Sequence, residues 1–425
     1  MKYGVLFMAA IATSAFGAGF TGAVDVPEEV ALPDPLVLQN GKKVESAEQW
    51  RNERRPELVE MFQKYVYGHL PPKPEKMSVT VERVNTNLFD GAATKSEVTL
   101  KYGPPDCPPL HLLLVVPNNK KPAPVFLCLN FHGNQAVLKD PDIALATGWQ
   151  TGTIHKNGIV NNHVTDEGRG VEESEWMVER TIKRGYAFAT FHNVDIEPDR
   201  TNAMEGTRAL YPQNDWGAIA AWAWGFHRAV DYLVTNPAID AKRIAVMGHS
   251  RNGKATILAA ALDERIAMAF PHQAGCGGTA PSRHTIGSGA AGFPDKVETI
   301  KRINTAFPHW FNAEFKKFLD TPEKLPLDQH ELLALCAPRP VLYSTAAEDR
   351  WANPPGQFEM MKAAGPVYRL LGASGLESEK FPEVNQPSLG GTLGFYFRDG
   401  KHATTADDWA VFLDFADKHF GVRSP

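Results

Sequence analysis

Residues 243–254 decide the fold of this chain, and they read Arg243-Ile244-Ala245-Val246-Met247-Gly248-His249-Ser250-Arg251-Asn252-Gly253-Lys254. A short apolar run leads straight into a turn that holds Ser250, and a stretch rich in alanine follows at helical length. This arrangement is typical of the nucleophile elbow, a sharp strand-to-helix turn that lifts a serine hydroxyl clear of a sheet. A serine that merely caps an ordinary strand-to-helix turn has a similar local sequence. The surrounding pattern of strands and helices therefore has to distinguish a nucleophile elbow from such a turn.

The turn departs from the usual G-x-S-x-G pattern at one position. The second glycine is expected at residue 252, where this chain has asparagine, and Gly253 follows one step later. Asparagine tolerates unusual backbone angles better than most residues, so we expect the departure to be mild. An earlier segment, residues 130–133, follows another predicted strand. In hydrolases with a nucleophile elbow, part of the oxyanion hole is built at such a place, and Gly133 would let a backbone amide approach the substrate there.

Apolar runs alternate with helical patterns on both sides of the elbow. Helical patterns cover Ala218–Leu233 and Lys254–Ala261. Short buried strands separated by helices indicate a parallel sheet with helices on both faces. The predicted strands of this part are Val125–Phe131, Tyr186–Phe191, Ile244–Met247, Ala267–Phe270, Val341–Tyr343 and Leu393–Phe397.

A different pattern precedes these strands. A helix is predicted over Ala47–Val66, and three segments with strand patterns follow at Ser78–Val84, Ser96–Tyr102 and Leu110–Val116. Antiparallel strands at the leading edge of an otherwise parallel sheet are a feature of the α/β-hydrolase fold. The sequence therefore predicts that fold, a mixed and mostly parallel sheet between two layers of helices.

A serine nucleophile needs a base, and in this fold the triad follows the chain order serine, carboxylate, histidine. Of the histidines after Ser250, only His402 follows the last predicted strand, in a loop that contains Gly400. Asp349 and Glu348 both directly follow the strand at residues 341–343. Position alone leaves both carboxylates as candidates for the acid.

Composition restricts the class of partner. The chain has 425 residues, 44 Lys plus Arg against 49 Asp plus Glu, and a net charge of −5. A basic surplus and a polybasic run are both missing, so we expect neither nucleic acid nor a membrane surface as a partner. Nothing in the sequence forms a metal-binding cluster, and the G-x-G-x-x-G at residues 287–292 follows no strand. We predict no metal and no cofactor.

The N-terminus has the pattern of an export signal. Lys2 precedes an apolar run at residues 3–11, and Ala15 and Gly17 have the spacing of a signal-peptidase site. We expect a signal peptide at residues 1–17, a linker or surface arm at 18–40 and a single catalytic domain at 41–425. The protein is then secreted or periplasmic, and we predict a monomer. One disulfide is possible in such a compartment, and its pairing stays open among Cys107, Cys128, Cys276 and Cys336.

Beyond these patterns, residues 248–254 resemble the G-x-S-R-x-G-K signature of the glucuronoyl esterases, carbohydrate esterase family 15. The resemblance to the bacterial branch runs from about residue 40 to the end of the chain. It rests on six further segments, Arg55-Pro56-Glu57, Tyr65-Val66-Tyr67-Gly68, Ala274-Gly275-Cys276-Gly277-Gly278, Arg302-Ile303-Asn304, Phe307-Pro308-His309-Trp310-Phe311 and Asp349-Arg350-Trp351-Ala352-Asn353-Pro354.

The resemblance implies hydrolysis of esters between the 4-O-methyl-glucuronic acid branches of xylan and lignin alcohols, without a cofactor. It implies Ser250 as nucleophile and His402 as base. Arg251 is implied as a side-chain donor to the oxyanion, where a fixed guanidinium adds a full positive charge. For the sugar, the resemblance implies hydrogen bonds from Lys254, an acidic binding position at Glu298 and packing of the uronate against Trp351.

One position departs from the family pattern. Many members carry a catalytic glutamate where this chain has Gln273. A neutral glutamine can orient an imidazole but cannot offset the charge of an imidazolium ion. The acid is therefore expected at Asp349, the position of some bacterial members, with Glu348 as the alternative. Two rival functions remain, an acetyl xylan esterase with the same triad and a carbohydrate-binding pseudoenzyme.

Overall fold

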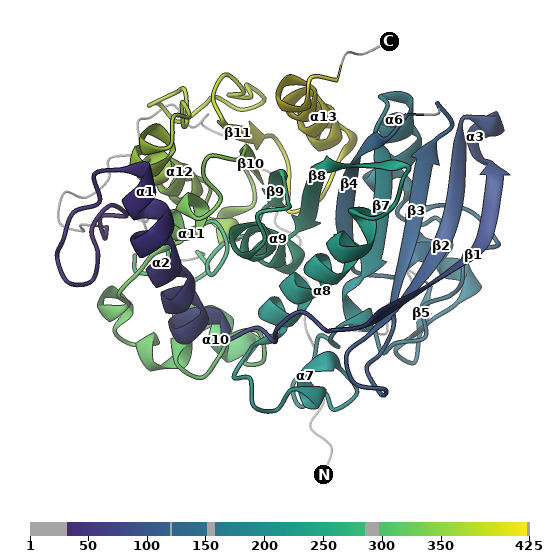
Figure 1. Ribbon diagram of the computed structural model, residues 1–425, viewed down its shortest axis with the longest axis horizontal. Helices are drawn as coiled ribbons and strands as arrows, with labels where there is room; N and C mark the ends of the chain where they lie inside the picture. The colour runs from purple at the N-terminus through teal and green to yellow at the C-terminus, as the bar shows by residue number, and fades with distance from the viewer. Residues whose placement is uncertain (1–31, 120, 151–157, 285–296, 423–425) are drawn as a thin grey trace, which may run out of the picture.

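The computed structural model describes residues 32–119, 121–150, 158–284 and 297–422 (Figure 1). The predicted signal peptide, the first part of the predicted arm and the glycine-rich stretch at residues 287–292 lie outside the described residues. No helix among the residues that the structure describes is both long and apolar enough to cross a membrane.

A nine-stranded sheet forms the centre of the molecule, in the order β1-β2-β3-β7-β4-β8-β9-β10-β11. The first three strands and β7 pair antiparallel, and all pairs from β7 to β11 are parallel. Every strand that the sequence predicts is present. The strands are β1 (Met77–Asn87), β2 (Ala93–Tyr102), β3 (Leu110–Pro117), β4 (Ala123–Asn130), β7 (Ala187–His192), β8 (Ile239–His249), β9 (Met268–His272), β10 (Val341–Ala346) and β11 (Leu393–Arg398), with a separate hairpin of β5 (Ile159–Val160) and β6 (His163–Val164).

The parallel strands are buried on both faces. In β4, Leu127 and Leu129 belong to one core cluster, whereas Phe126 and Cys128 belong to the other. Successive side chains of a strand point to opposite faces, so a strand covered on both sides has to be apolar throughout. This explains why the parallel strands appear in the sequence as continuous apolar runs.

Helices cover the two faces of the sheet (Figure 1). One core cluster joins the sheet to α8, α9, α11 and α12, and the other joins it to α6 and α13. The predicted fold, a sheet between two layers of helices, is therefore confirmed. The longer helices are α2 (Arg55–Phe62), α6 (Val178–Lys183), α8 (Ala218–Leu233), α9 (Arg251–Leu262), α10 (Ile300–Ala306), α11 (Gln329–Ala334), α12 (Pro354–Leu370) and α13 (Ala406–Phe420).

Short helical segments make up the remainder. They are α1 (Ala47–Gln49), η1 (Trp50–Arg54), η2 (Gln63–Tyr67), α3 (Leu88–Gly91), α4 (Asn134–Val137), η4 (Asp166–Gly168), α5 (Glu173–Trp176), η5 (Asn193–Asp195), α7 (Thr207–Leu210), η6 (Phe315–Phe318), η7 (Pro322–Lys324) and η8 (Arg350–Ala352). The predicted helix at 47–66 is the continuous run of α1, η1, α2 and η2. It ends at Tyr67, and the next residue, Gly68, has a φ of 84°, where an added Cβ would lie only 2.2 Å from Trp216 Cα.

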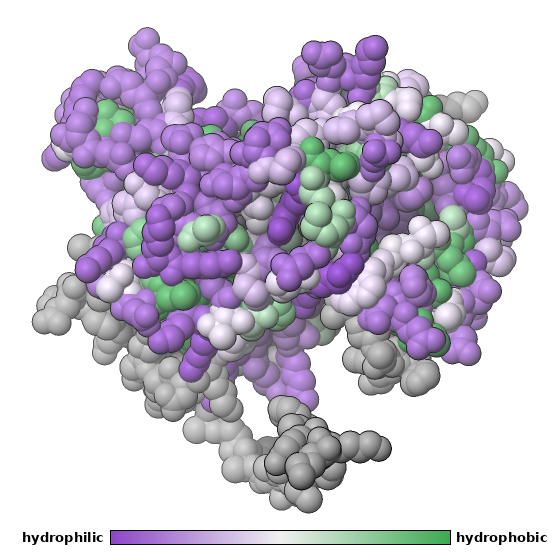
Figure 2. Space-filling model, turned by 90° about the horizontal axis from the view of Figure 1, so that it is seen from below, coloured by the Kyte–Doolittle hydropathy of each residue, from purple (hydrophilic) through white to green (hydrophobic). Residues whose placement is uncertain are grey.

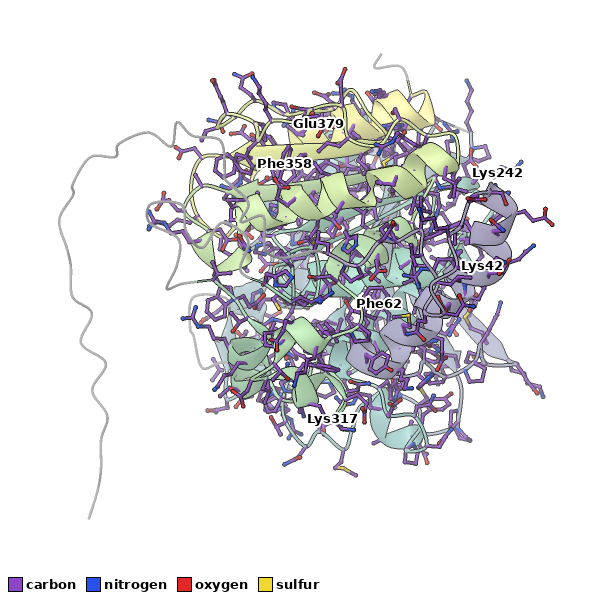
Figure 3. The ribbon with its side chains drawn as sticks, turned by 90° about the vertical axis from the view of Figure 1, so that its left-hand side faces the viewer. Lys42, Phe62, Lys242, Lys317, Phe358 and Glu379 are labelled. Atoms are coloured by element: carbon purple, nitrogen blue, oxygen red, sulfur yellow. The ribbon has the colours of Figure 1, made fainter. Side chains whose placement is uncertain are left out.

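The N-terminal helical run and α12 lie on one side of the molecule (Figure 3). There Phe62 and Phe358 are buried, at 0% and 1% exposure, whereas Lys42 and Lys317 lie at the surface. The face seen in Figure 2 is mostly hydrophilic, with apolar residues scattered over it. The described part of the arm is docked, because Pro33 O accepts a hydrogen bond from His330 Nε2 at 2.8 Å. All four cysteines are buried and free.

Candidate active site

Ser250 stands in a strained turn between β8 and α9. Its φ and ψ are 58° and −125°, a region that residues with a side chain rarely adopt, and its N–H donates to His272 O at 2.9 Å. Such a conformation costs about 1–3 kcal/mol and persists only where the surroundings enforce it. A Cβ on Gly248 would lie 2.4 Å from Asn252 O, so the chain needs a glycine there.

The displaced second glycine has a packing reason. Asn252 is a helical residue of α9, completely buried, and its Nδ2 donates to Leu129 O at 3.0 Å. Asn252 therefore needs no unusual backbone angle, and its side-chain amide makes a packing contact instead. Gly253 is the residue that must be small, since a Cβ there would lie 2.8 Å from His272 O.

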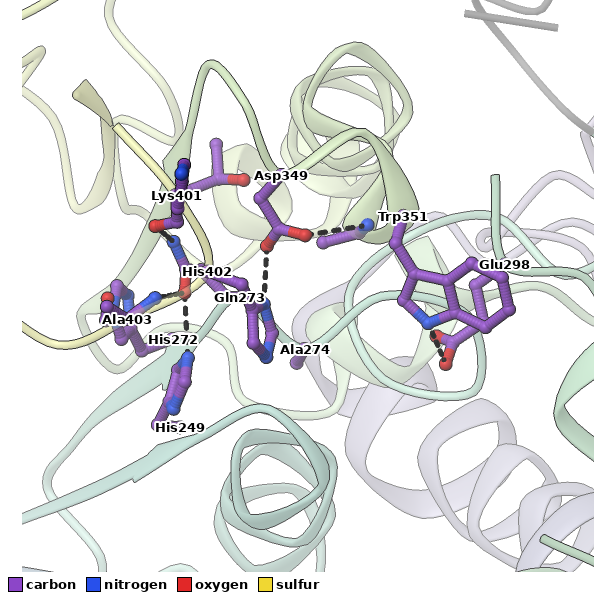
Figure 4. Close-up of polar contacts among 12 residues, drawn as sticks. His249, His272, Gln273, Ala274, Glu298, Asp349, Trp351, Lys401, His402 and Ala403 are labelled. Atoms are coloured by element: carbon purple, nitrogen blue, oxygen red, sulfur yellow. Dashed lines mark hydrogen bonds and ion pairs between the residues drawn. The ribbon is translucent and has the colours of Figure 1, made fainter. Parts of the chain in front are cut away.

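His402 follows β11 and faces Asp349, which follows β10 (Figure 4). The Nδ1 atom of His402 lies 2.7 Å from Oδ2 of Asp349, and the Asp349 side chain is only 2% exposed. Glu348, the other candidate, is exposed. The structure thus brings Asp349 to the histidine and leaves Glu348 at the surface, and the catalytic role of either residue stays a prediction.

The loop that carries His402, residues 399–403, is called the base loop here. Arg398 holds it by donating to three of its backbone carbonyls, and its Nε donates to Asp408 Oδ2 of α13 at 2.9 Å. Both Arg398 and Asp408 are buried. A guanidinium with this many fixed acceptors holds the loop in one conformation. The three carbonyl acceptors belong to Asp399 at 2.6 Å, Lys401 at 2.8 Å and Ala403 at 2.5 Å.

The side chain of Gln273 contacts the neighbours of His402 rather than the His402 ring itself. Its Oε1 accepts from His249 Nε2 at 2.7 Å and from the backbone N–H of Ala403 at 3.0 Å (Figure 4). The glutamine side chain therefore bonds to the base loop and to the residue before Ser250, and within the described part of the chain it has no hydrogen bond to the ring of His402.

A cavity of about 440 Å³ opens at the elbow. Its lining includes Ser250, Arg251 and His402, together with Phe131, His132 and Glu172. The candidate nucleophile, the candidate base and a guanidinium therefore border the same space. A pocket with a few convergent polar groups is the usual form of a small-molecule site.

Arg251 is held by charge and by aromatic rings. Its Nη1 forms an ion pair with Asp199, and its guanidinium carbon lies 4.9 Å from the ring centre of Trp310 and 5.4 Å from that of Phe307. Cation–π contacts of this kind orient a guanidinium without using its donors. The buried Nε–H of Arg251 has no hydrogen-bond acceptor among the residues that the structure describes.

Asp199 is a site residue that sequence reasoning missed. One of its oxygens accepts from His309 Nε2 and from Trp310 Nε1, each at 2.8 Å, and its other oxygen pairs with Arg251. Burial would raise the pKa of the Asp199 carboxyl, but His309 and Arg251 outweigh it and hold that pKa below its ordinary value. The only sequence signal for this contact was the segment with His309 and Trp310, which the family resemblance singled out without assigning it a role.

The loop after β4 limits the expected contribution of Gly133 to an oxyanion hole. The N–H of Gly133 donates to Asn130 Oδ1 at 2.8 Å, so this amide is already bonded and is not available to an oxyanion. His132 pairs with Glu172, and Glu172 also accepts from Trp176 Nε1 at 3.0 Å. Burial raises the pKa of Glu172, but the His132 contact more than compensates and lowers that pKa overall.

The residues implied for sugar binding form one connected cluster. Glu298 Oε2 accepts from Lys254 Nζ at 2.7 Å, and Glu298 Oε1 accepts from Trp351 Nε1 at 2.8 Å (Figure 4). Lys254 also donates to the carbonyls of Ala274 and Cys276, at 2.6 and 2.7 Å. All three ammonium donors are therefore in use. Trp351 is 40% exposed and offers a flat apolar surface.

This arrangement suits acyl transfer through a serine. It has a candidate nucleophile, a histidine backed by a buried carboxylate and a guanidinium for negative charge. Among the residues that the structure describes, no group of three or more His, Cys, Asp or Glu side chains has the geometry to hold a metal ion.

Comparison with known proteins finds relatives that are named as esterases. A family model described as glucuronyl esterase of fungi matches residues 171–372. Carbohydrate esterase MZ0003, from an unknown prokaryotic organism, is 43% identical over 91% of this chain and 89% of its own length. The 4-O-methyl-glucuronoyl methylesterase 1 of Wolfiporia cocos is 28% identical over 80% of this chain and 72% of its own.

Solved structures that resemble this chain are esterases of the same kind as its sequence relatives. A promiscuous CE15 esterase from the marine bacterial metagenome superposes with a TM-score of 0.83 at 42% identity, covering 93% of this chain and 98% of that one. A glucuronoyl esterase from Solibacter usitatus superposes with a TM-score of 0.84 at 37% identity, covering 93% and 99%.

Proposed function

The chain belongs to carbohydrate esterase family 15, the glucuronoyl esterases, and we propose that it hydrolyses the ester between 4-O-methyl-glucuronic acid of glucuronoxylan and a lignin alcohol. It is then a carboxylic ester hydrolase that acts at the junction of xylan and lignin. The observation that supports this most is that Ser250, His402 and Arg251 border one cavity.

In the first half-reaction, His402 removes the hydroxyl proton as Ser250 attacks the uronate carbonyl carbon. The tetrahedral intermediate collapses when the C–O bond to the alcohol breaks, and His402 gives its proton to the leaving oxygen. In the second half-reaction, His402 removes a proton from water, which attacks the glucuronoyl-serine ester. Collapse returns the proton to Ser250 and releases the free uronate. Asp349 stabilises the imidazolium form of His402 in both halves.

Arg251 stabilises the oxyanion in both tetrahedral intermediates. Its free Nε–H and its fixed charge support this role, together with the backbone amides at the start of α9. Since the Gly133 amide is bonded to Asn130, the side chain of Arg251 has a larger share of the work than in a hydrolase with two free amides.

We assign the sugar to the cluster of Lys254, Glu298 and Trp351. The exposed ring of Trp351 packs against the uronate face, and the carboxylate of Glu298 accepts hydrogen bonds from sugar hydroxyls. A hydroxyl can contact Lys254 directly only if it displaces one of the three acceptors of the ammonium group. Lys254 therefore serves the sugar mainly by holding the side chain of Glu298 in position.

The test is turnover of a benzyl ester of glucuronic acid, compared with release of acetate from acetylated xylan. We expect hydrolysis of the first substrate, its loss in Ser250→Ala and no loss in the surface control Ser374→Ala. Activity only on acetylated xylan would replace the proposed substrate. Binding of glucuronoxylan fragments without turnover that depends on Ser250 would make the protein a carbohydrate-binding pseudoenzyme.

The export signal and the monomeric state belong to the same proposal. A polymeric substrate of plant cell walls lies outside the cell, which agrees with the pattern of residues 1–17 as a signal peptide. Cleavage after Gly17, read by mass spectrometry of the exported protein, and a single species near 46.7 kDa or slightly below in sedimentation test these two points.

A further inference from the structure

His249 and Gln273 form a hydrogen-bonded pair beside the base, and the proposed reaction has no role for either of them. His249 ends β8 and directly precedes Ser250. Gln273 follows β9 with a φ of 49°, and its backbone N–H donates to Ser344 O at 2.9 Å. Glutamine is under strain in this left-handed region, so its surroundings hold it there.

The orientation of the Gln273 amide follows from its neighbours. The backbone N–H of Ala403 can only donate, and it points at Oε1 from 3.0 Å. The other amide atom, Nε2, faces the carbonyl of Lys401 at 3.4 Å, which can only accept. The atom that faces His249 Nε2 at 2.7 Å is therefore the oxygen, and His249 must carry its proton on Nε2.

The ring of His249 packs against the base. Its centre lies 4.4 Å from the ring centre of His402, with 40° between the planes, and 5.0 Å from that of His272. His272 in turn lies 3.8 Å from Asp408, which is paired with Arg398. Burial, followed by the nearby His402 and His272, lowers the pKa of His249 well below its ordinary value.

We propose that Gln273 is a positioning residue, which fixes His249 as a neutral imidazole and thereby holds its ring against the face of His402. The amide also ties the base loop to β9 through Ala403. Gln273 thus occupies the place expected for a catalytic acid but acts on the neighbour of the base. This inference deepens the proposed function and rests on it.

The neutrality of His249 matters because His402 becomes positively charged in each half-reaction. A second imidazolium at 4.4 Å would repel that charge and disfavour the proton uptake on which catalysis depends. An amide oxygen gives His249 a good acceptor without adding a charge. A carboxylate at the same position would favour protonation of His249.

The first experiment follows the ring nitrogens of His249 by NMR, in full-length protein labelled with 15N-histidine and assigned with His249→Phe. We expect a neutral ring with the proton on Nε2 throughout the range from about pH 5 to 8. Titration of His249 within this range overturns the proposal. This readout needs no turnover, so it stays informative if the proposed ester proves not to be the substrate.

The second experiment measures the pH profile of kcat/KM on the benzyl ester in Gln273→Glu. Once a carboxylate faces it, His249 takes up a proton in the assay range, so the acid limb steepens from a slope of about one to about two. The double variant Gln273→Glu with His249→Phe removes the second titration and restores a slope of about one. A slope unchanged in Gln273→Glu, with His249 still neutral by NMR, contradicts the proposal.

A third variant tests whether the hydrogen bonds of Gln273 position the base. Gln273→Met keeps the length of the side chain but removes its hydrogen bonds to His249 and Ala403. We expect kcat to fall by about 10- to 100-fold while KM stays within about twofold, because the base is misplaced and the sugar cluster is untouched. A change in KM alone, or no change in either constant, rejects the positioning role.

Discussion

The Nδ1 atom of His402 lies 2.7 Å from Oδ2 of Asp349. The two partners differ in their surroundings, since the histidine side chain is 38% exposed and the aspartate side chain only 2%. One ring nitrogen is thus held by a buried carboxylate, while the ring borders the cavity that also contains Ser250. A carboxylate in this position fixes the tautomer of the ring and stabilises its charged form.

We expect Asp349→Asn to lower kcat on the benzyl glucuronate ester by about 10⁴-fold, because the neutral amide cannot stabilise the imidazolium ion. Glu348→Gln is the matched control, since it changes the adjacent carboxylate, which is exposed. It should leave kcat within about twofold of the wild type. Equal, mild effects of both variants would refute the assignment of the acid.

Asp199→Asn should lower kcat by about 10- to 100-fold, since Arg251 loses the charge that holds its guanidinium. KM should change much less, because the sugar cluster does not include Asp199. Steady-state kinetics separates the two constants. Asp263→Asn removes another carboxylate that is paired with an arginine, Arg265, and should leave both constants unchanged.

Lys254→Met should destabilise the fold by about 3–5 kcal/mol, because it leaves the carboxylate of Glu298 buried without its partner. The two side chains are only 3% and 4% exposed, so solvent screens this pair little. Adding Glu298→Gln should recover part of the loss, and denaturant unfolding of the single and double variants measures it. Simple additivity of the two changes would show that the pair is not coupled.

The ion pair of His111 with Asp195 should make the stability of the fold depend on pH. Its hydrogen bond to Asp195, at 3.3 Å from Nδ1, is the main cause that raises its pKa above the ordinary 6.5. A raised pKa in the folded state contributes stability below 6.5, and this contribution is lost as the pH rises through the raised value. The thermal midpoint of His111→Gln should therefore fall further below that of the wild type at about pH 5.5 than at about pH 8.5.

Asp195→Asn should reproduce this pH dependence, because it removes the same ion pair from the other side. The effect is modest, since the His111 side chain is 47% exposed and solvent screens the pair. A difference between the variant and the wild type that is equal at both pH values would show that the pair contributes nothing that depends on charge.

The sequence predicts the fold well because the fold depends on local patterns. Continuous apolar runs report strands that are buried on both faces, and the apolar run before Ser250 reports the elbow. His402 is found from its place after the last strand. Each of these signals lies within a few residues of the feature that it predicts.

The parts of the site that escape the sequence depend on contacts between distant segments. Asp199 meets Arg251, His309 and Trp310 across 52, 110 and 111 positions of the chain, and nothing near Asp199 announces these partners. The hydrogen bond of Asn252 escapes the sequence for the same reason, since its partner Leu129 lies 123 positions away. Position alone also left Glu348 and Asp349 equal, and they are distinguished by the burial of Asp349 and its contact with His402.

The contacts of Arg398 have a consequence for the end of the chain. This arginine donates hydrogen bonds to the base loop and also to Oδ2 of Asp408. The other carboxylate oxygen of Asp408, Oδ1, accepts from Ser344 Oγ at 2.9 Å. Asp408 belongs to the final helix, α13, which follows every strand of the sheet. A protease that trimmed the chain before Ala406 would leave all nine strands in place yet release the anchor of His402. The C-terminal helix in this way secures the position of His402, although none of its residues borders the cavity at Ser250.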